Sequence, residues 1–254
     1  VSLLNTAVQV LSALIHDVDH AGVPNFLLVK ESTRLAGMYD NKSVAEQNSV
    51  DLAWDILMES RFIDLRRCIY RNTTELRRFR QMLVNTVLAT DIFDKELQAL
   101  RKTRWENAFN THQCQHTQMD KNRRATIVIE HLIQASDVSH CMQHFDIYMK
   151  WNYRLFQEMS RAYELDRSNT EPSLGWFKSE IWFFDNYVIP LARKLDECGV
   201  FGAHSQEYLN YALQNRKRFA LTGKKAIEDY KTRYQEEKKM KNKKMSAKPS
   251  FDEL

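Results

Sequence analysis

The sequence has few of the residues that turn a chain. Only 6 glycines and 4 prolines occur among its 254 residues, whereas a β-sandwich or barrel needs a turn signal roughly every 8–12 residues. No stretch approaches the roughly 18 uninterrupted apolar residues of a membrane span, and the first residues lack the basic region and cleavage site of a secretory signal. Because 43% of the residues are hydrophobic, the chain can bury a sizeable core. We therefore expect an all-α fold without a membrane span.

Cysteine is scarce too, and basic charge is concentrated at one end. The four cysteines are scattered without a Cys-x-x-Cys pair, which favours reduced thiols in a cytoplasmic protein over a disulfide framework. Residues 216–245 hold 12 Lys and Arg against 4 Asp and Glu, whereas residues 1–215 hold 24 against 27. A slightly acidic folded part argues against a nucleic-acid-binding protein. We interpret the basic end as a solvated helix end and linker, with attraction to anionic lipid or RNA as the alternative.

Apolar residues at helical spacing predict where the helices lie. An apolar stripe from Leu4 to Ile15 ends at a charged cluster. Ser43 and Glu46 indicate a capping box at the start of a second helix, and Asp120 is a candidate cap for a later one. The patterns predict helices over 43–59, 73–87, 120–137, 145–164, 176–195 and 205–234, and loops over 101–119 and 165–174.

The segment HDVDH at 16–20 concentrates two imidazoles and two carboxylates directly after the apolar stripe. Such groups are costly to bury without a partner. Imidazole nitrogen and carboxylate oxygen together suit Zn²⁺, Mn²⁺ or Fe²⁺, and a carboxylate can bridge to a neighbouring Mg²⁺. The segment therefore predicts a metal site, with a polar helix end and solvated charges as the alternative.

Other candidate ligands carry a weaker signal. Asp137 ends an apolar helix among small residues. The pairs His112/His116 and His140/His144 have the i, i+4 spacing with which one helix face can hold a metal, although the polar surroundings of the first pair favour a surface loop. No Gly-x-Gly-x-x-Gly, Gly-x-Ser-x-Gly or P-loop pattern occurs, so nucleotide-loop and serine-hydrolase functions lose support. A metal hydrolase is the leading enzyme class.

Five segments, taken in order, resemble the class I cyclic-nucleotide phosphodiesterases, whose catalytic domain is a compact all-helical fold of the HD type. HDVDHAGVPN at 16–25 is similar to the family's second metal motif. The other four segments are SVAEQNS at 43–49, LATDIF at 88–93, QASDVS at 134–139 and SEIWFFDNYVIPL at 179–191. The resemblance runs from about residue 11 to about residue 219, and it implies that same fold here.

The resemblance implies a two-metal site. His16, Asp17 and Asp137 are implied to be ligands of a Zn²⁺-like first ion, and Asp17 is implied to touch a second ion as well, Mg²⁺ or Mn²⁺. His20 is implied to lie near the bridging water and the phosphate.

The resemblance also implies groups that hold the metal-bound waters in place. These are Glu46 and the Thr90–Asp91 pair, and losing such a group commonly costs 10- to 100-fold in affinity or activity. We therefore count His20, Glu46 and Asp91 as the expected catalytic residues.

A purine pocket is implied at the later segments. Phe183 is implied to stack on the base with Leu155 on its other face, for which plain core packing is the alternative. Tyr148, Trp151 and His140 are implied to be lesser pocket residues. Glu180 stands where the family has its base-reading glutamine. A carboxylate only accepts hydrogen bonds, and guanine offers two adjacent N–H donors where adenine offers one, so Glu180 favours cyclic GMP or use of both nucleotides.

The implied activity is hydrolysis of 3',5'-cyclic nucleotides, cyclic GMP or cyclic AMP, to 5'-nucleoside monophosphates in signal transduction, by a hydroxide that two metal ions activate. In the family, a histidine from an earlier motif supplies a further ligand and protonates the leaving oxygen. The chain begins with Val rather than Met and after that motif. We therefore expect a fragment that is impaired on its own. It would hold the catalytic domain in 1–219 and a charged, basic C-terminal helix and disordered tail in 220–254.

Two alternatives stay open. One is a non-catalytic cyclic-nucleotide-binding regulatory module, and the other is a different HD-type phosphohydrolase, which would lack the pocket segment at 179–191. The expected partner is a cyclic nucleotide and not a nucleic acid, with a membrane, cyclase or sensor domain upstream. The expected location is the cytoplasm or the cytosolic part of a membrane protein.

Overall fold

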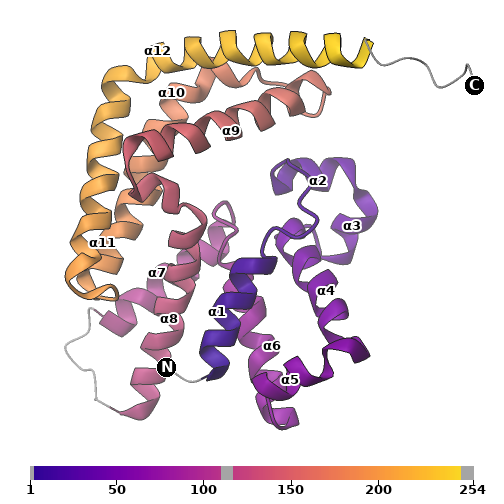
Figure 1. The fold of residues 1–254 in the computed structure, drawn as a ribbon. Coiled ribbons are helices and arrows are strands. Elements are labelled where there is room, and N and C mark those ends of the chain that lie inside the picture. The colour runs from indigo at the N-terminus through magenta and orange to yellow at the C-terminus, as the bar shows by residue number, and fades with distance from the viewer. Residues whose placement is uncertain (1–2, 110–116, 247–254) are drawn as a thin grey trace, which may run out of the picture. The chain divides into compact units, whose positions relative to one another are not determined.

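The computed structural model describes residues 3–109 and 117–246. These residues form helices and no strand, which confirms the all-α fold (Figure 1). None of the helices in these two ranges combines the length and the hydropathy that crossing a bilayer requires. The α-helices are α1 (Leu3–Ile15), α2 (Asn25–Glu31), α3 (Thr33–Met38), α4 (Val44–Met58), α5 (Ile63–Ile69), α6 (Thr73–Leu88), α7 (Lys95–Phe109), α8 (Gln118–Asp137), α9 (Phe145–Glu164), α10 (Pro172–Phe183), α11 (Ile189–Glu197) and α12 (Ser205–Ser246). The short 3-10 segments are η1 (Ser60–Phe62), η2 (Ser139–Met142) and η4 (Gly202–His204), and η3 (Phe184–Val188) is a π-helix.

The chain folds into two compact units. The first comprises the described residues up to Ser139 together with Arg193–Ser205, and the second comprises His140–Ala192 and the rest of α12.

The core of the first unit lies where α1, α4, α6 and α8 pack together. Val8 and Ile15 of α1 are buried against Phe79 and Leu83 of α6, which confirms the predicted stripe. Fully burying an apolar side chain of this kind contributes about 1.5–3 kcal/mol. Because α1 and α8 both pack on α6, the ends of these two helices are held in fixed positions.

The predicted caps differ from the observed ones. Helix α4 begins where expected. Ser43, however, has a left-handed backbone (φ 40°) and makes no cap hydrogen bond, so the prediction of a capping box is wrong. The oxygen that caps α4 is Oδ1 of Asn25, which accepts from the Ala45 N–H at 2.9 Å. Helix α8 begins at Gln118 with Thr117 as its cap, so the cap predicted at Asp120 is wrong as well.

The predicted loop over 101–119 is wrong at both ends, because residues 101–109 belong to α7 and residues 118–119 to α8. Residues 110–116 of this prediction lie outside the described residues. Arg101, Trp105 and Ala108 are the buried residues of α7 and follow helical spacing. The periodicity is not visible in the hydropathy pattern, because arginine is polar and is therefore expected at the surface. The other predicted loop holds over 165–171, and α10 then begins at Pro172, a favoured residue in the first turn.

The second unit has an aromatic core. Tyr148 of α9 is fully buried and makes edge contacts with the rings of Phe184 and Phe219. The single helix expected over 176–195 is interrupted by the π-helix η3. Pro190 follows at once and has no N–H for an ordinary helical bond, which accounts for a wider turn here.

Helix α12 continues beyond the expected end at residue 234 to Ser246. Gly223 within it is required by a close approach, because a Cβ there would lie 2.8 Å from the Phe219 ring. Tyr230 is buried and packs against Tyr153 and Phe156 of α9. Helix α12 therefore contributes to the aromatic core beyond residue 220. The predicted division of the chain between residues 219 and 220 stays a prediction.

Candidate metal centre and substrate-binding residues

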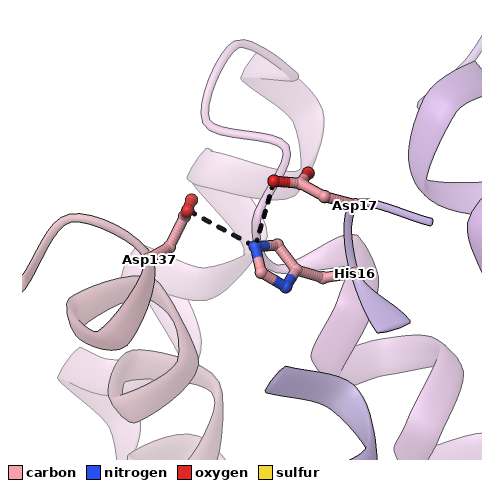
Figure 2. Close-up of side chains that lie close together, drawn as sticks. All are labelled: His16, Asp17 and Asp137. Carbon is pink, nitrogen blue, oxygen red and sulfur yellow. Dashed lines mark ion pairs between the residues drawn. The ribbon is translucent and has the colours of Figure 1, made fainter. Parts of the chain in front are cut away.

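Three ligand-capable side chains converge in the first unit (Figure 2). His16 and Asp17 follow the last turn of α1, and Asp137 is the last residue of α8. The His16 Nε2 atom lies 3.4 Å from Asp17 Oδ2 and 3.4 Å from Asp137 Oδ1. One donor atom from each residue lies within 4.8 Å of the others. The structure therefore brings together the three predicted metal ligands, although 120 residues separate Asp17 from Asp137 along the chain.

The turn after α1 is held by α4. The Ser49 hydroxyl donates to the Val18 carbonyl at 2.6 Å, and the Asn48 amide donates to Asp19 Oδ2 at 3.3 Å. Asp19 and Gly22 both have a positive φ, 61° and 69°, so the chain reverses sharply here. These contacts fix the segment that carries the two histidines of the motif.

The geometry of His16 suits metal binding. Its Nδ1 lies 3.0 Å from the Ala13 carbonyl oxygen, which fixes Nδ1 as the protonated nitrogen and leaves the Nε2 lone pair facing both carboxylates. Without a cation the hydrogen bond to Asp137, with the charges of both carboxylates, raises the pKa of His16 to about 9. Two carboxylates facing one imidazole nitrogen favour a positive charge at this point, carried either by the His16 proton or by a bound metal ion. One imidazole nitrogen and two carboxylate oxygens are a donor set that fits Zn²⁺, Mn²⁺ or Fe²⁺.

A second polar group joins three segments of the same unit, and we call it the Asn25 cluster: Asn25, Ser43, Glu46 and Asp91. The Asn25 amide nitrogen donates to Glu46 Oε2 at 2.8 Å and to Asp91 Oδ2 at 3.1 Å. The Ser43 hydroxyl also donates to Asp91 Oδ2, at 2.8 Å. The structure therefore brings together Glu46 and Asp91, two of the three expected catalytic residues.

Burial, above all, raises the pKa of Glu46. The hydrogen bond from Asn25 opposes this shift, the charge of Asp91 adds to it, and the nearby His20 lowers the pKa. His20 itself is exposed, and its Nδ1 accepts from the Gly22 N–H at 3.2 Å. Glu46 lies on α4, and Asn48 and Ser49 of the same helix hydrogen-bond to the HDVDH segment. The carboxylate is therefore carried by the helix that contacts this segment.

Glu180 is buried in the second unit with only 9% of its surface exposed. The Tyr148 hydroxyl donates to its Oε2 at 2.8 Å. A hydrogen bond with the Asn152 side chain also lowers its pKa, yet burial prevails and raises the pKa of Glu180 to about 7. The Trp176 N–H donates to Asn152 Oδ1 at 3.1 Å, which orients that amide with its NH₂ group available to Glu180.

The other predicted pocket residues lie nearer the surface. Phe183 is half-buried and stacks on Tyr187, with ring centroids 5.3 Å apart and planes 20° apart. Leu155 and Trp151 are each 46% exposed, so Leu155 is not a core residue. The His140 ring lies 6.2 Å from the Trp151 ring. The binding roles of these residues stay predictions.

The histidine pairs offer no further metal site among the described residues. His112 and His116 lie outside those residues. His140 belongs to the 3-10 segment η2 and His144 is the cap of α9, so they do not share one α-helical face, and the predicted i, i+4 arrangement is wrong. His144 instead makes a 3.2 Å contact with the Tyr211 hydroxyl.

Sequence patterns miss several residues that support the site. Asn25 is the most connected of them, and its only signal is its place at the end of the Gly-Val-Pro-Asn turn. Gln134 donates from α8 to the Ala89 carbonyl at 2.9 Å. Arg101 donates to the Asp91 carbonyl at 3.1 Å. These bonds attach the 88–91 segment to α8 and α7.

Comparisons with known proteins show which family this chain matches. Residues 1–209 match the model of the 3'5'-cyclic nucleotide phosphodiesterase family. The probable 3',5'-cyclic-AMP phosphodiesterase pde-4 of Caenorhabditis elegans is 29% identical over 200 residues, and the match covers 73% of this chain and 29% of the relative. The 3',5'-cyclic-AMP phosphodiesterase 4C of Mus musculus is 28% identical over 206 residues, covering 73% of this chain and 28% of the relative. The chain thus spans less than a third of the length of either relative.

A solved structure shows the same fold. The phosphodiesterase domain of the RhoPDE fusion protein from the choanoflagellate Salpingoeca rosetta superposes with a TM-score of 0.69 at 21% identity, covering 89% of this chain and 72% of that one. The family resemblance of the five sequence segments is confirmed, because the family model spans most of the chain. This chain belongs to the 3'5'-cyclic nucleotide phosphodiesterase family.

Proposed function

We propose that this chain is catalytic machinery for the metal-dependent hydrolysis of 3',5'-cyclic nucleotides to 5'-nucleoside monophosphates. The observation that carries the proposal is the convergence of His16, Asp17 and Asp137 on one point with 3.4 Å contacts. Membership of the family implies divalent metal binding and a cyclic nucleotide substrate. The scattered cysteines favour a cytoplasmic location.

The ions we propose are Zn²⁺ at His16, Asp17 and Asp137, and Mg²⁺ or Mn²⁺ sharing Asp17. A divalent cation bound there neutralises charge on a phosphodiester and lowers the pKa of a water molecule enough for attack near neutral pH. The chain's own residues prepare for this. The Ala13 carbonyl holds His16 in the tautomer that presents Nε2. We propose that the exposed His20 imidazole donates to a phosphate oxygen.

Glu46 is the carboxylate we propose as acceptor for a water hydrogen. It is half-buried on α4, the helix that hydrogen-bonds to the HDVDH segment, and Asn25 occupies only its Oε2. Asp91 supports it through the same amide.

Phe183 and Leu155 are the residues we propose for the two faces of the purine, with His140 and Tyr148 shaping the pocket. The relatives named above are cyclic-AMP phosphodiesterases. Here Glu180 receives its hydrogen bonds from Tyr148 and Asn152, so an ionised Glu180 offers lone pairs only. Guanine presents two N–H donors to such an acceptor, and we therefore propose cyclic GMP as a substrate alongside cyclic AMP.

Hydrolysis of both nucleotides, measured with Mg²⁺ and trace Zn²⁺, tests the proposal. Asp137→Asn should lower bound metal and reduce turnover by at least about 100-fold, whereas the same change at the exposed Asp64 should alter neither. Equal metal content in wild type and Asp137→Asn would refute the metal centre. The expectation that the chain alone turns over slowly stays a prediction, so cyclic-nucleotide binding is measured in parallel.

Binding without turnover, also in the longer protein, would instead identify a non-catalytic regulatory module. Turnover of other phosphate esters but not of cyclic nucleotides would identify a different HD-type phosphohydrolase.

A further inference from the structure

The Asn25 side chain uses its full hydrogen-bonding capacity. Its amide nitrogen donates to Glu46 Oε2 at 2.8 Å and to Asp91 Oδ2 at 3.1 Å, and its carbonyl oxygen accepts from the Ala45 N–H at 2.9 Å. An asparagine amide has two N–H donors and one acceptor oxygen. One side chain at the start of α2 therefore joins the first turn of α4 to the segment that follows α6.

Asp91 has little capacity left for another partner. Its Oδ2 accepts from Ser43 at 2.8 Å and from Asn25, and its Oδ1 accepts from the backbone N–H groups of Phe93 at 3.1 Å and Asp94 at 3.2 Å. A carboxylate has about four lone-pair positions, and these four donors fill them.

Ser43 supports the same arrangement at a conformational cost. Its backbone is left-handed, with φ 40° and ψ 49°, and such a conformation costs a non-glycine residue of order 1–3 kcal/mol. The strained backbone places the Ser43 hydroxyl against Asp91 rather than in the cap of α4. Asn25 caps α4 in place of Ser43. The strained backbone of Ser43 and the hydrogen bonds of Asn25 therefore support the same arrangement of Asp91 and α4.

Glu46 contrasts with Asp91. Asn25 is the only side chain among the described residues that donates to it, and the bond involves Oε2 alone. Burial and the charge of Asp91 raise the pKa of Glu46, and the bond from Asn25 counteracts both. Two carboxylates are thus held close together by the two N–H groups of one amide.

We propose that Asn25 is a positioning residue that holds the Glu46 carboxylate at the metal centre, and that Asp91 anchors Asn25 rather than contacting a metal-bound water itself. This inference rests on the proposed function, because it assigns Glu46 a role at that centre. In this arrangement Glu46 supports metal binding directly, and Asn25 holds the Glu46 carboxylate in position. Asp91 affects metal binding only through Asn25.

The test is Mn²⁺ binding by calorimetry, which does not depend on turnover. Asn25→Leu keeps the approximate size of the side chain and removes both donors, and it should weaken Mn²⁺ binding about 10- to 100-fold, as losing a ligand-supporting group commonly does. Glu46→Gln should weaken it to a similar extent. The double variant should lose no more than the larger single loss, because both changes remove one coupled unit. Asp91→Asn should likewise add nothing to Asn25→Leu.

A core variant separates positioning from stability. Leu83 is buried in the core of the first unit, and Leu83→Ala should lower Tm without changing the affinity for Mn²⁺ below Tm. The inference is overturned if Asn25→Leu lowers Tm as Leu83→Ala does and leaves the affinity for Mn²⁺ unchanged, or if its effect adds fully to that of Glu46→Gln. His16→Ala keeps the two proposals apart. If it abolishes binding while Asn25→Leu does not weaken it, the metal centre stands and the inference fails, whereas a wild-type chain that binds no Mn²⁺ overturns both.

Discussion

The Tyr148 hydroxyl donates to Glu180 Oε2 at 2.8 Å in the interior of the second unit, where Tyr148 is fully buried. This contact makes Tyr148 a support of the Glu180 carboxyl group. Burial raises the pKa of Glu180 to about 7, so its protonation changes near neutral pH. Above that pH the group only accepts hydrogen bonds, and below it the group can also donate one.

The preference between the two nucleotides should therefore depend on pH. Ionised Glu180 matches the two N–H donors of guanine, whereas the protonated group can donate to adenine and accept from its amine. We expect the ratio of kcat/KM for cyclic GMP to that for cyclic AMP to rise as pH increases from 6 to 8. Glu180→Gln, which does not titrate, should give a ratio that is flat with pH. A wild-type ratio as flat as that of Glu180→Gln would show that Glu180 does not read the base.

Tyr148→Phe should move this transition to higher pH. The change removes the hydroxyl that stabilises the ionised carboxylate and keeps the ring that packs on Phe184 and Phe219. A hydrogen bond to a charged group contributes about 1.5–3 kcal/mol, so the midpoint should rise by roughly one to two pH units. The same measurement of the two nucleotides across pH gives the midpoint. A midpoint that stays in place would mean that another donor replaces Tyr148.

Phe183→Ala should weaken the binding of purine cyclic nucleotides and leave metal content unchanged. Stacking of a base on an aromatic ring contributes about 1–3 kcal/mol, which corresponds to a rise in Kd of roughly 5- to 150-fold. Trp182→Ala is the matched control, because Trp182 neighbours Phe183 on α10 and is 58% exposed. Calorimetry gives the Kd and elemental analysis the metal. Equal effects of the two substitutions would argue against a stacking role.

Stability should fall in acid because of His131 in the first unit. Its Nδ1 contacts the Ile127 carbonyl at 2.8 Å and its Nε2 contacts Lys194 at 3.3 Å. Burial, above all, lowers the pKa of His131 from 6.5 to about 4. The unfolded chain therefore binds more protons between these values, and the free energy of unfolding decreases as pH falls through this window, by up to about 3 kcal/mol.

Urea denaturation between pH 7 and 4.5 measures this effect. His131→Phe should show a shallower pH dependence than wild type, and the difference between the two proteins isolates His131 from other titrating groups. Parallel pH profiles would contradict the account, since they would mean that His131 binds protons equally in both states.

The convergence of the three candidate metal ligands could be predicted because the sequence concentrates their signal. HDVDH is a local pattern, and Asp137 lies in a segment that resembles a family motif. The HDVDH segment follows the end of α1 and Asp137 ends α8, and both helices pack on α6. Apolar periodicity therefore predicts that these candidate ligands lie at helix ends. The pairing of His16 with Asp137 required the resemblance, because apolar spacing does not determine which helix ends meet.

The Asn25 cluster could not be predicted. Asn25 lies 21 residues from Glu46 and 66 from Asp91, and no spacing rule relates such distant partners. The capping box failed for the same reason, because Ser43 finds a tertiary partner in Asp91. Helix α7 was not predicted because its buried Arg101 interrupts the apolar pattern. The π-helix η3 was not predicted because a π-helix has no characteristic hydropathy pattern. In each case a specific polar or steric contact overrode a local pattern.

The most direct test of the central claim is a crystal structure of the protein grown with Zn²⁺, with anomalous diffraction recorded at the zinc edge. We predict a peak between His16, Asp17 and Asp137, with Nε2 and one oxygen of each carboxylate about 2.0–2.2 Å from it. A zinc peak bound elsewhere, with His16 still paired directly to both carboxylates, would contradict the account.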